Sequence, residues 1–165
     1  MQIEIRDLAP GDADWLVAQH QQSYAASDGF DESFGLVVAQ ILRDFQATRA
    51  PRGERAFIAW AGGRRLGSVF CVRLDARTAK LRLFLVVPEA RGLGLGRRLL
   101  AACMDWARAQ GYAAMELWTH ESHHAACALY ARAGWRCVAA RPVRNFGVDL
   151  VEQTWRVDLG AEGVW

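Results

Sequence analysis

One segment constrains the fold more than any other: a strand that runs into a helix through a loop containing three glycines. The loop lies within residues 86–98. Before it, residues 80–87 alternate apolar and polar side chains and then become fully apolar up to Pro88, which is typical of a buried strand. After it, residues 99–109 carry apolar side chains at helical spacing and precede a glycine. The sequence therefore predicts a strand–loop–helix unit of the kind found in α/β domains.

The chemistry of this junction favours a bound phosphate. Glycines allow backbone N–H groups to approach an anion closely, and a helix N-terminus adds unpaired donors and partial positive charge. Arg91, Arg97 and Arg98 add full positive charges where the helix alone would favour acidic residues. The glycine spacing fits neither the P-loop, G-x-x-x-x-G-K-[ST], nor the Rossmann fingerprint, G-x-G-x-x-G. We therefore expect a phosphate-binding loop of another kind.

The rest of the chain predicts a single domain over residues 1–165, in which helices and strands are mixed. We expect strands over residues 3–6, 56–61, 66–74, 80–87, 112–119, 135–141 and 148–158, and helices over 10–24, 34–45, 99–109 and 125–133. A helical crossover joins strands 80–87 and 112–119, so these two should be parallel. The expected fold class is α/β (α+β), with six to seven strands and about four helices.

Composition excludes several classes of protein. The 165 residues are 52% hydrophobic and carry a formal net charge of +2, which argues against disorder and against nucleic acid or a membrane as the main partner. The four cysteines form no C-x-x-C pair and lie in apolar stretches, so we expect reduced thiols. The N-terminus shows no signal-peptide pattern, and no apolar run has the length of a membrane helix. These features predict a cytoplasmic protein.

Two motifs resemble the signatures of a known family. Residues 91–96 form R-x-x-G-x-G, and residues 126–135 form A-x-x-L-Y-x-x-x-G-W. Both are similar to motifs of the GCN5-related N-acetyltransferases (GNAT), and the predicted element order resembles theirs over nearly the whole chain. The resemblance implies a mixed, mostly antiparallel sheet whose parallel central pair splays to admit acetyl-CoA. Residues 117–119 and 146–155 further resemble the acetyltransferase domain fused to MarR-type regulators in bacteria, here in a free-standing form.

The resemblance also implies which residues hold the acyl donor, acetyl-CoA. They lie at the end of the splayed strand, in the glycine loop and just before the second motif: Leu85, Val86, Val87, Arg91, Gly92, Leu93, Gly94, Leu95, Gly96, Arg97 and His123. Backbone N–H groups around Val86 would stabilise the oxyanion. His123 stands where the family commonly has an asparagine that contacts the pantetheine arm, so its hydrogen-bond geometry and charge differ.

For catalysis, the resemblance assigns Tyr130 as the acid that protonates the departing thiolate. A thiol has a pKa of about 8.5 and a phenol of about 10, so a positioned tyrosine needs little tuning for this task. The general base is left open, because Trp118 occupies the position of the glutamate base that some members have. Glu116 lies two residues earlier on the same strand face and is one candidate; a solvated or ion-paired role is the alternative.

The acceptor amine is expected to bind between the two early helices and the last hairpin. Asp28 and Phe30 combine an acid with an aromatic ring, which can hold an ammonium group, although Asp28 also fits a turn. Tyr24 and Phe146 are the other candidates for this pocket. The expected acceptor is a small-molecule or peptide amine, and a homodimer is a further expectation from the family.

Two alternative functions follow from the same sequence. Residues 120–124 match the zinc-protease motif H-E-x-x-H, but they follow a predicted strand and straddle the start of a helix, whereas zinc binding needs both histidines on one helix. We therefore expect no metal. The second alternative is a non-catalytic acyl-CoA-binding or sensory module on the same fold, against which the retained Tyr130 argues.

Overall fold

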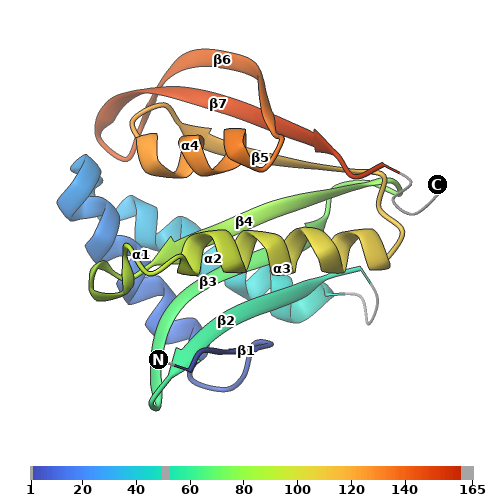
Figure 1. Cartoon of the computed structure of the whole chain (residues 1–165). Helices are drawn as coiled ribbons and strands as arrows, with labels where there is room; N and C mark the ends of the chain where they lie inside the picture. The colour runs from blue at the N-terminus through green and yellow to red at the C-terminus, as the bar shows by residue number, and fades with distance from the viewer. Residues whose placement is uncertain (1, 50–52, 161–165) are drawn as a thin grey trace.

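Seven strands form one mixed sheet, in the spatial order β1-β2-β3-β4-β5-β7-β6 (Figure 1). The structure is a computed structural model that describes residues 2–49 and 53–160. The strands are β1 (Glu4–Arg6), β2 (Arg55–Ala61), β3 (Arg64–Arg73), β4 (Thr78–Val86), β5 (Ala114–His120), β6 (Arg136–Asn145) and β7 (Val148–Asp158). The helices are α1 (Asp12–Asp28), α2 (Ser33–Thr48), α3 (Leu95–Ala109) and α4 (His124–Arg132), with a short 3₁₀ turn at Pro88–Ala90. The α/β fold class is confirmed.

Helices cover both faces of the sheet because strand side chains alternate in direction. On β2, Ile58 packs with Leu16 of α1 and Leu42 of α2. The neighbouring Phe57 points to the other face and joins the cluster formed with α3. Two apolar layers therefore lie on opposite sides of the central strands.

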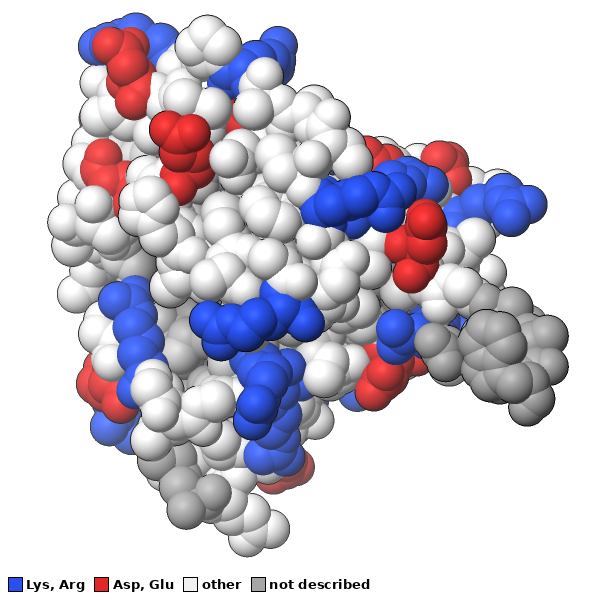
Figure 2. All heavy atoms as spheres, turned by 45° about the horizontal axis from the view of Figure 1, so that its top comes forward, with Lys and Arg blue, Asp and Glu red and all other residues white. Residues whose placement is uncertain are grey.

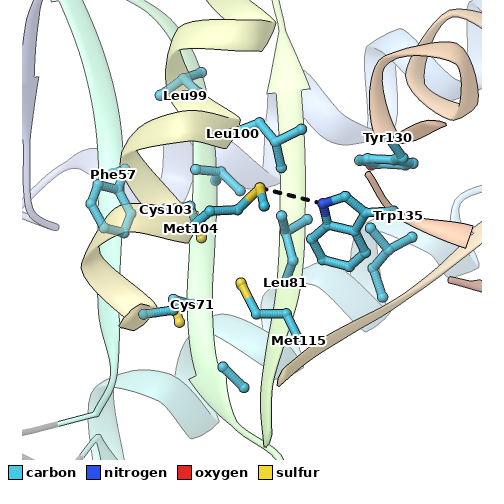
Figure 3. Close-up of a cluster of buried hydrophobic side chains, with 14 of the residues drawn as sticks. Phe57, Cys71, Leu81, Leu99, Leu100, Cys103, Met104, Met115, Tyr130 and Trp135 are labelled. Carbon is cyan, nitrogen blue, oxygen red and sulfur yellow. Dashed lines mark hydrogen bonds between the residues drawn. The ribbon is translucent and has the colours of Figure 1, made fainter. Parts of the chain in front are cut away.

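The layer under α3 is the larger core. Figure 3 shows its side chains between α3, β4 and the segment that carries Tyr130 and Trp135. The indole N–H of Trp135 donates to the Met104 sulfur at 3.4 Å, which ties the end of α4 to α3. Tyr130 is therefore held by packing on three sides.

The parallel pair β4 and β5 separates soon after it begins. Only three residue pairs are in register, from Thr78 with Ala114 to Lys80 with Glu116. Beyond them β5 stays paired with β7 along its whole length, so the outer edge of β4 loses its strand partner. Figure 1 shows β4 and β5 drawing apart toward the end of the sheet near α1. The predicted splayed central pair is confirmed.

A bulge in β4 lies beside this fork. The register between β3 and β4 shifts between Ser68 and Phe70, and Leu83 has a φ of 51°, which is rare for a residue with a branched side chain. The hydroxyl of Ser68 donates to the Leu83 carbonyl at 2.7 Å and stabilises the kink. The bulge turns the β4 edge at the point where β5 leaves it.

Several predicted boundaries were wrong by a few residues. Helix α1 continues to Asp28 rather than ending at residue 24, because Gly29 adopts the left-handed conformation that terminates it. Helix α3 begins at Leu95 rather than at residue 99, since Gly94 is its N-cap. Strand β6 extends to Asn145, four residues beyond the prediction.

Neither the distribution of surface charge in Figure 2 nor the hydropathy of the helices indicates where a functional site lies. In the view of Figure 2, acidic and basic side chains are scattered over the face, several of them in contact with one another, around a largely uncharged middle. Within residues 2–49 and 53–160, none of the helices combines the length and the apolar character that crossing a membrane requires.

Candidate active site

A cavity of about 250 Å³ lies at the fork between β4 and β5, closed on its other sides by α1, α2, α4 and the turn between β6 and β7. Five of the residues predicted for the site line it: Tyr24, Phe30, His123, Tyr130 and Phe146. These residues come from segments far apart in the sequence, and the fold brings them together at one place.

The glycine loop leaves the N-terminus of α3 open. Gly94 has a φ of 76° and caps α3 without any side-chain hydrogen bond, so the first N–H groups of the helix have no acceptor from the cap. Gly92 also has a positive φ, and Gly96 lies in the first helical turn. This arrangement presents backbone donors and the positive end of the helix dipole, which together suit a phosphate.

The two arginines predicted to bind the cofactor differ in what they contact. The Arg91 guanidinium donates to the Val86 carbonyl at 3.3 Å and so bends back along β4. Arg97 is exposed in the first turn of α3. Arg98, next to it, donates to the Ile3 carbonyl at 3.0 Å and anchors β1.

The apolar residues of the predicted cofactor set contribute in different ways. Leu85, Val87 and Leu95 are buried in the core, so their side chains cannot reach a ligand. The Val87 N–H donates to the Leu66 carbonyl at 2.9 Å and is not free for an oxyanion. Leu93 is 56% exposed beside the loop and is open to an apolar part of a ligand. The side chain and the N–H of Val87 therefore stabilise the fold, and the sequence did not indicate this.

Tyr130 lies in α4 with its ring buried and 3% exposed. The ring packs near Phe84, Trp135 and Trp155, with centroid distances of 6.0, 5.8 and 6.1 Å. Burial raises the pKa of Tyr130 well above its usual value. The phenol is therefore protonated at neutral pH, and Tyr130 lines the cavity.

Asp28 and His123, predicted to act separately, form one hydrogen-bonded chain with Thr119. The Asp28 carboxylate accepts from His123 Nε2 at 2.6 Å and from the Ser122 hydroxyl at 3.1 Å. Burial opposes ionisation of Asp28, but bonds from Ser27, His123 and Ser122 hold its pKa below the usual value. Because an ionised carboxylate only accepts, Nε2 carries a proton; Nδ1 lies 3.2 Å from the Thr119 hydroxyl and can accept from it when the imidazole is neutral.

Four aromatic rings close the end of the cavity that faces the helices: Tyr24, Phe30, Phe34 and Phe146. Neighbouring centroids lie 4.8 to 5.6 Å apart. Phe146 sits at the tip of the β6–β7 hairpin with a φ of 55°, and its carbonyl accepts the Asp31 N–H at 2.9 Å. The predicted meeting of the early helices and the last hairpin is therefore present in the structure.

Glu116 and Asp28 do not line this cavity. A general base at Glu116 or a direct contact of Asp28 with the acceptor amine would require them to do so. The Glu116 carboxylate is 3.2 Å from Arg156 Nη1 and forms an ion pair, which is the alternative that the sequence left open. Asp28 faces His123 instead of a ligand ammonium. Its predicted contact with the acceptor would therefore have to be indirect.

Sequence reasoning missed several residues that line the cavity, chiefly Lys80, Arg82, Thr119 and His20. The signal for the first two was available: charged residues at alternate positions of a strand that is otherwise apolar. No local pattern distinguishes Thr119 or His20, because their role comes from elements that meet only in the folded chain.

The zinc-protease reading is not supported by the geometry. His120 is the last residue of β5 and His124 the first residue of α4, so the two histidines do not share a helix. Across residues 2–49 and 53–160, no three histidine, cysteine or acidic side chains are grouped as metal ligands would be.

Comparison with known proteins agrees with the fold and the loop. The sequence profile of the acetyltransferase (GNAT) family matches residues 14–135. The chain belongs to this family. It is therefore a GNAT acyltransferase that uses acetyl-CoA, while the resemblance to MarR-fused domains stays a prediction. A search of curated protein sequences found no match.

Solved structures share the GNAT fold at low sequence identity. YncA from Salmonella typhimurium, assigned as an acetyltransferase and solved with its cofactor acetyl-CoA, is 20% identical, with a TM-score of 0.79 over 98% of this chain and 96% of that one. The ribosomal-protein-S18-alanine N-acetyltransferase of Escherichia coli is 22% identical, with a TM-score of 0.71 over 99% of both chains. A GCN5-related N-acetyltransferase from Kribbella flavida is 22% identical, with a TM-score of 0.73 over 94% and 97%.

A buried histidine beside the cavity makes the stability of this GNAT domain depend on pH. His20 is 1% exposed, and Nδ1 lies 2.7 Å from the Leu16 carbonyl, to which it can donate, whereas Nε2 has no hydrogen-bond partner among the described residues. Burial lowers its pKa from the usual 6.5 to about 4. The folded state therefore binds fewer protons than the unfolded state between these two values.

We expect the free energy of unfolding to fall as the pH drops from about 6.5 to 4, with His20 contributing about 3 kcal/mol of the loss. Urea denaturation of the wild type and of His20→Phe at pH 7 and pH 4 measures that contribution. The variant should lose less stability on acidification than the wild type. Equal losses in both proteins would contradict the assignment to His20.

Proposed function

We propose that the protein transfers the acetyl group of acetyl-CoA to a primary amine by direct attack in a ternary complex. The observation that carries this proposal is the cavity at the fork of β4 and β5, which Tyr130 and Phe84 line. The Phe84 ring lies 3.7 Å from where a Cβ on Gly96 would be, so the cavity wall is next to the first turn of α3. A donor with a pyrophosphate at one end and a thioester at the other matches such an arrangement. Membership of the GNAT family supports acetyl-CoA as that donor.

The donor would be held by main-chain groups more than by side chains. The pyrophosphate would accept from N–H groups of the loop and of the first turn of α3, with Arg97 adding charge. The pantetheine arm would run along the edge of β4 that β5 leaves unpaired. An N–H on that edge, beyond the bulge at Leu83, would stabilise the oxyanion of the tetrahedral intermediate.

Tyr130 would supply the proton that the departing CoA thiolate needs. A buried phenol with a raised pKa keeps its proton at neutral pH, so the hydroxyl is available to hydrogen-bond to the developing thiolate and to give it a proton as the C–S bond breaks. This role requires no other acid in the cavity.

The amine would lose its proton through Thr119, His123 and Asp28. In this scheme the Thr119 hydroxyl accepts a proton from the attacking ammonium and passes its own to His123 Nδ1. The carboxylate of Asp28, 2.6 Å from Nε2, stabilises the positive imidazolium that forms. This step leaves the amine neutral and the imidazole protonated. After the neutral amine attacks the thioester, its nitrogen loses a second proton, which replaces the proton that Tyr130 gives to the thiolate, and the imidazolium releases its proton to solvent. Glu116 is proposed no longer as the base, since its carboxylate is paired with Arg156.

The proposal is tested by incubating the protein with acetyl-CoA and a panel of primary amines. Release of free CoA thiol and the mass of the N-acetylated product should appear together, in equal amounts, for at least one amine. CoA release without acetylated product would contradict transfer to an amine. Binding of acetyl-CoA with no turnover on any amine would favour the non-catalytic acyl-CoA-binding module instead.

The proton relay predicts the effect of Thr119→Val, which keeps the shape of the side chain but removes its hydroxyl from His123. We expect kcat to fall about tenfold near neutral pH, because water can only partly replace the hydroxyl. The deficit should shrink at high pH, where more of the amine is already deprotonated. A pH profile of kcat for both proteins measures this, and a deficit that is constant with pH would count against the relay.

A further inference from the structure

Two positive side chains on β4 line the cavity without a carboxylate to balance them. Lys80 and Arg82 are two residues apart on the strand, so they point to the same face. Lys80 is only 8% exposed, and the ring of Trp118 covers its ammonium with Nζ 3.3 Å from the ring centroid. Across residues 2–49 and 53–160, no carboxylate oxygen lies within 4.0 Å of either side chain.

The acidic residues whose charges act on this pair are each bonded to another group. They are Glu116 and Glu152 for Lys80 and Asp44 for Arg82. Asp44 accepts from Gln40 at 2.8 Å. Glu116 pairs with Arg156 at 3.2 Å, and Glu152, which lines the cavity from β7, pairs with Arg141 at 3.2 Å. Asp28 is hydrogen-bonded to His123. Among the described residues, the cavity wall formed by β4 therefore carries two positive charges that no carboxylate contacts directly.

Such an arrangement is unfavourable for the empty protein. Burial, together with the charge of Arg82, lowers the pKa of Lys80 from its usual 10.5 to about 8, although the charges of Glu116 and Glu152 oppose the shift. Burial also lowers the pKa of Arg82, against the opposing charge of Asp44. The Trp118 ring offsets part of this cost through a cation–π contact. An anion placed between the two groups would remove their mutual repulsion and satisfy their N–H donors.

We propose that Lys80 and Arg82 form the binding site for an anionic group, a carboxylate or a phosphate, carried by the acceptor amine. This inference rests on the proposed function and adds the chemical class of the acceptor to it. An α-amino acid fits the site well: its carboxylate would lie against β4, and its side chain would lie toward the aromatic rings of Tyr24, Phe34 and Phe146. Its amine would then lie within the cavity that Thr119 and Tyr130 line.

The test compares acceptors that differ only in the anionic group. One series is phenylalanine, phenylalanine amide and phenethylamine, which share the same aromatic side chain. On the α-carbon, phenylalanine has a carboxylate, the amide has a neutral carboxamide, and phenethylamine has only hydrogen. A second series, phosphoethanolamine against ethanolamine, separates phosphate from carboxylate. We expect the wild type to have a kcat/KM at least tenfold higher for the anionic member of one series.

Variants assign that preference to the two residues. Arg82→Gln and Lys80→Met remove the charges while keeping much of the side-chain length, and each should raise KM for the anionic acceptor about tenfold. For the neutral acceptor both should stay within about twofold of the wild type. Arg136→Gln is the matched control, since Arg136 is exposed on β6 and outside the cavity. Thermal unfolding and acetyl-CoA affinity check that each variant is folded.

Binding of the amino acid without acetyl-CoA gives a readout that does not depend on turnover. Calorimetry should show that Arg82→Gln weakens phenylalanine or phosphoethanolamine binding about tenfold, whereas Arg136→Gln leaves it unchanged. If the wild type binds the anionic amine through Arg82 but acetylates none, the proposed function fails and the anion site stands. If it acetylates amines but treats anionic and neutral members alike, the anion site is overturned and the proposed function stands.

Discussion

Replacing Tyr130 with phenylalanine is expected to lower kcat for acetyl transfer by at least about a hundredfold while acetyl-CoA affinity stays within about twofold. The departing thiolate would lose its positioned proton donor, and general acid catalysis of this kind is typically worth a hundredfold or more. Binding should persist because the ring keeps its packing against Phe84, Trp135 and Trp155. Steady-state thiol release gives kcat, and calorimetry gives the affinity.

Tyr112→Phe is the matched control for this substitution. Its hydroxyl donates to the Gly53 carbonyl at 2.6 Å, far from the cavity lining, so its removal should cost about 1 kcal/mol of stability and leave kcat unchanged. A normal kcat in Tyr130→Phe would contradict the acid role. A loss in both variants would indicate a general effect of destabilisation instead.

The second large effect is expected at the loop, where Gly94→Ala should weaken acetyl-CoA binding tenfold or more. Gly94 caps α3 with a φ of 76°, a conformation that costs an alanine about 1–2 kcal/mol. An added Cβ meets no protein atom within 4 Å, so an effect on affinity would come from a change in the backbone or from the methyl group facing the pyrophosphate. If the alanine shifts the loop toward negative φ, the N–H groups at the start of α3 turn away from the pyrophosphate, and each charge-assisted bond lost costs about 1.5–3 kcal/mol.

Gly63→Ala provides the comparison. Gly63 lies in the turn between β2 and β3 with the same φ of 76°, and an added Cβ there also meets nothing within 4 Å. Both variants should lose similar stability in urea denaturation, but only Gly94→Ala should lose affinity for acetyl-CoA in calorimetry. Equal affinities in the two variants would contradict a role of the loop in cofactor binding.

The sequence predicted the parts of this fold whose causes are local. Glycines after an apolar strand marked the loop at Gly94, and helical spacing around Tyr130 placed the second motif on a helix. The helical crossover predicted the parallel pair, because two strands joined in this way have few other arrangements. The boundaries that were wrong depended on single residues, as where α1, predicted to end at residue 24, continues until Gly29 terminates it.

What the sequence could not predict depends on contacts between distant segments. Asp28 and His123 are 95 positions apart, and nothing near either residue indicates that they form a hydrogen bond. Glu116 was a candidate base only because it lies two residues before Trp118 on the same face of the strand. In the structure its carboxylate pairs with Arg156 on the neighbouring strand β7. The charges at Lys80 and Arg82 on an otherwise apolar strand are visible in the sequence, but that they line a cavity depends on β5 leaving β4 after Lys80.

The central claim is that acetyl-CoA binds in the fork between β4 and β5 and at the N-terminus of α3. Amide hydrogen exchange, measured by mass spectrometry with and without acetyl-CoA, tests this most directly. The account predicts that the cofactor slows exchange over residues 82–98 and around Tyr130, and leaves the turn at Gly62 and Gly63 unchanged. Protection confined to other parts of the chain, or no protection at saturating acetyl-CoA, would contradict it.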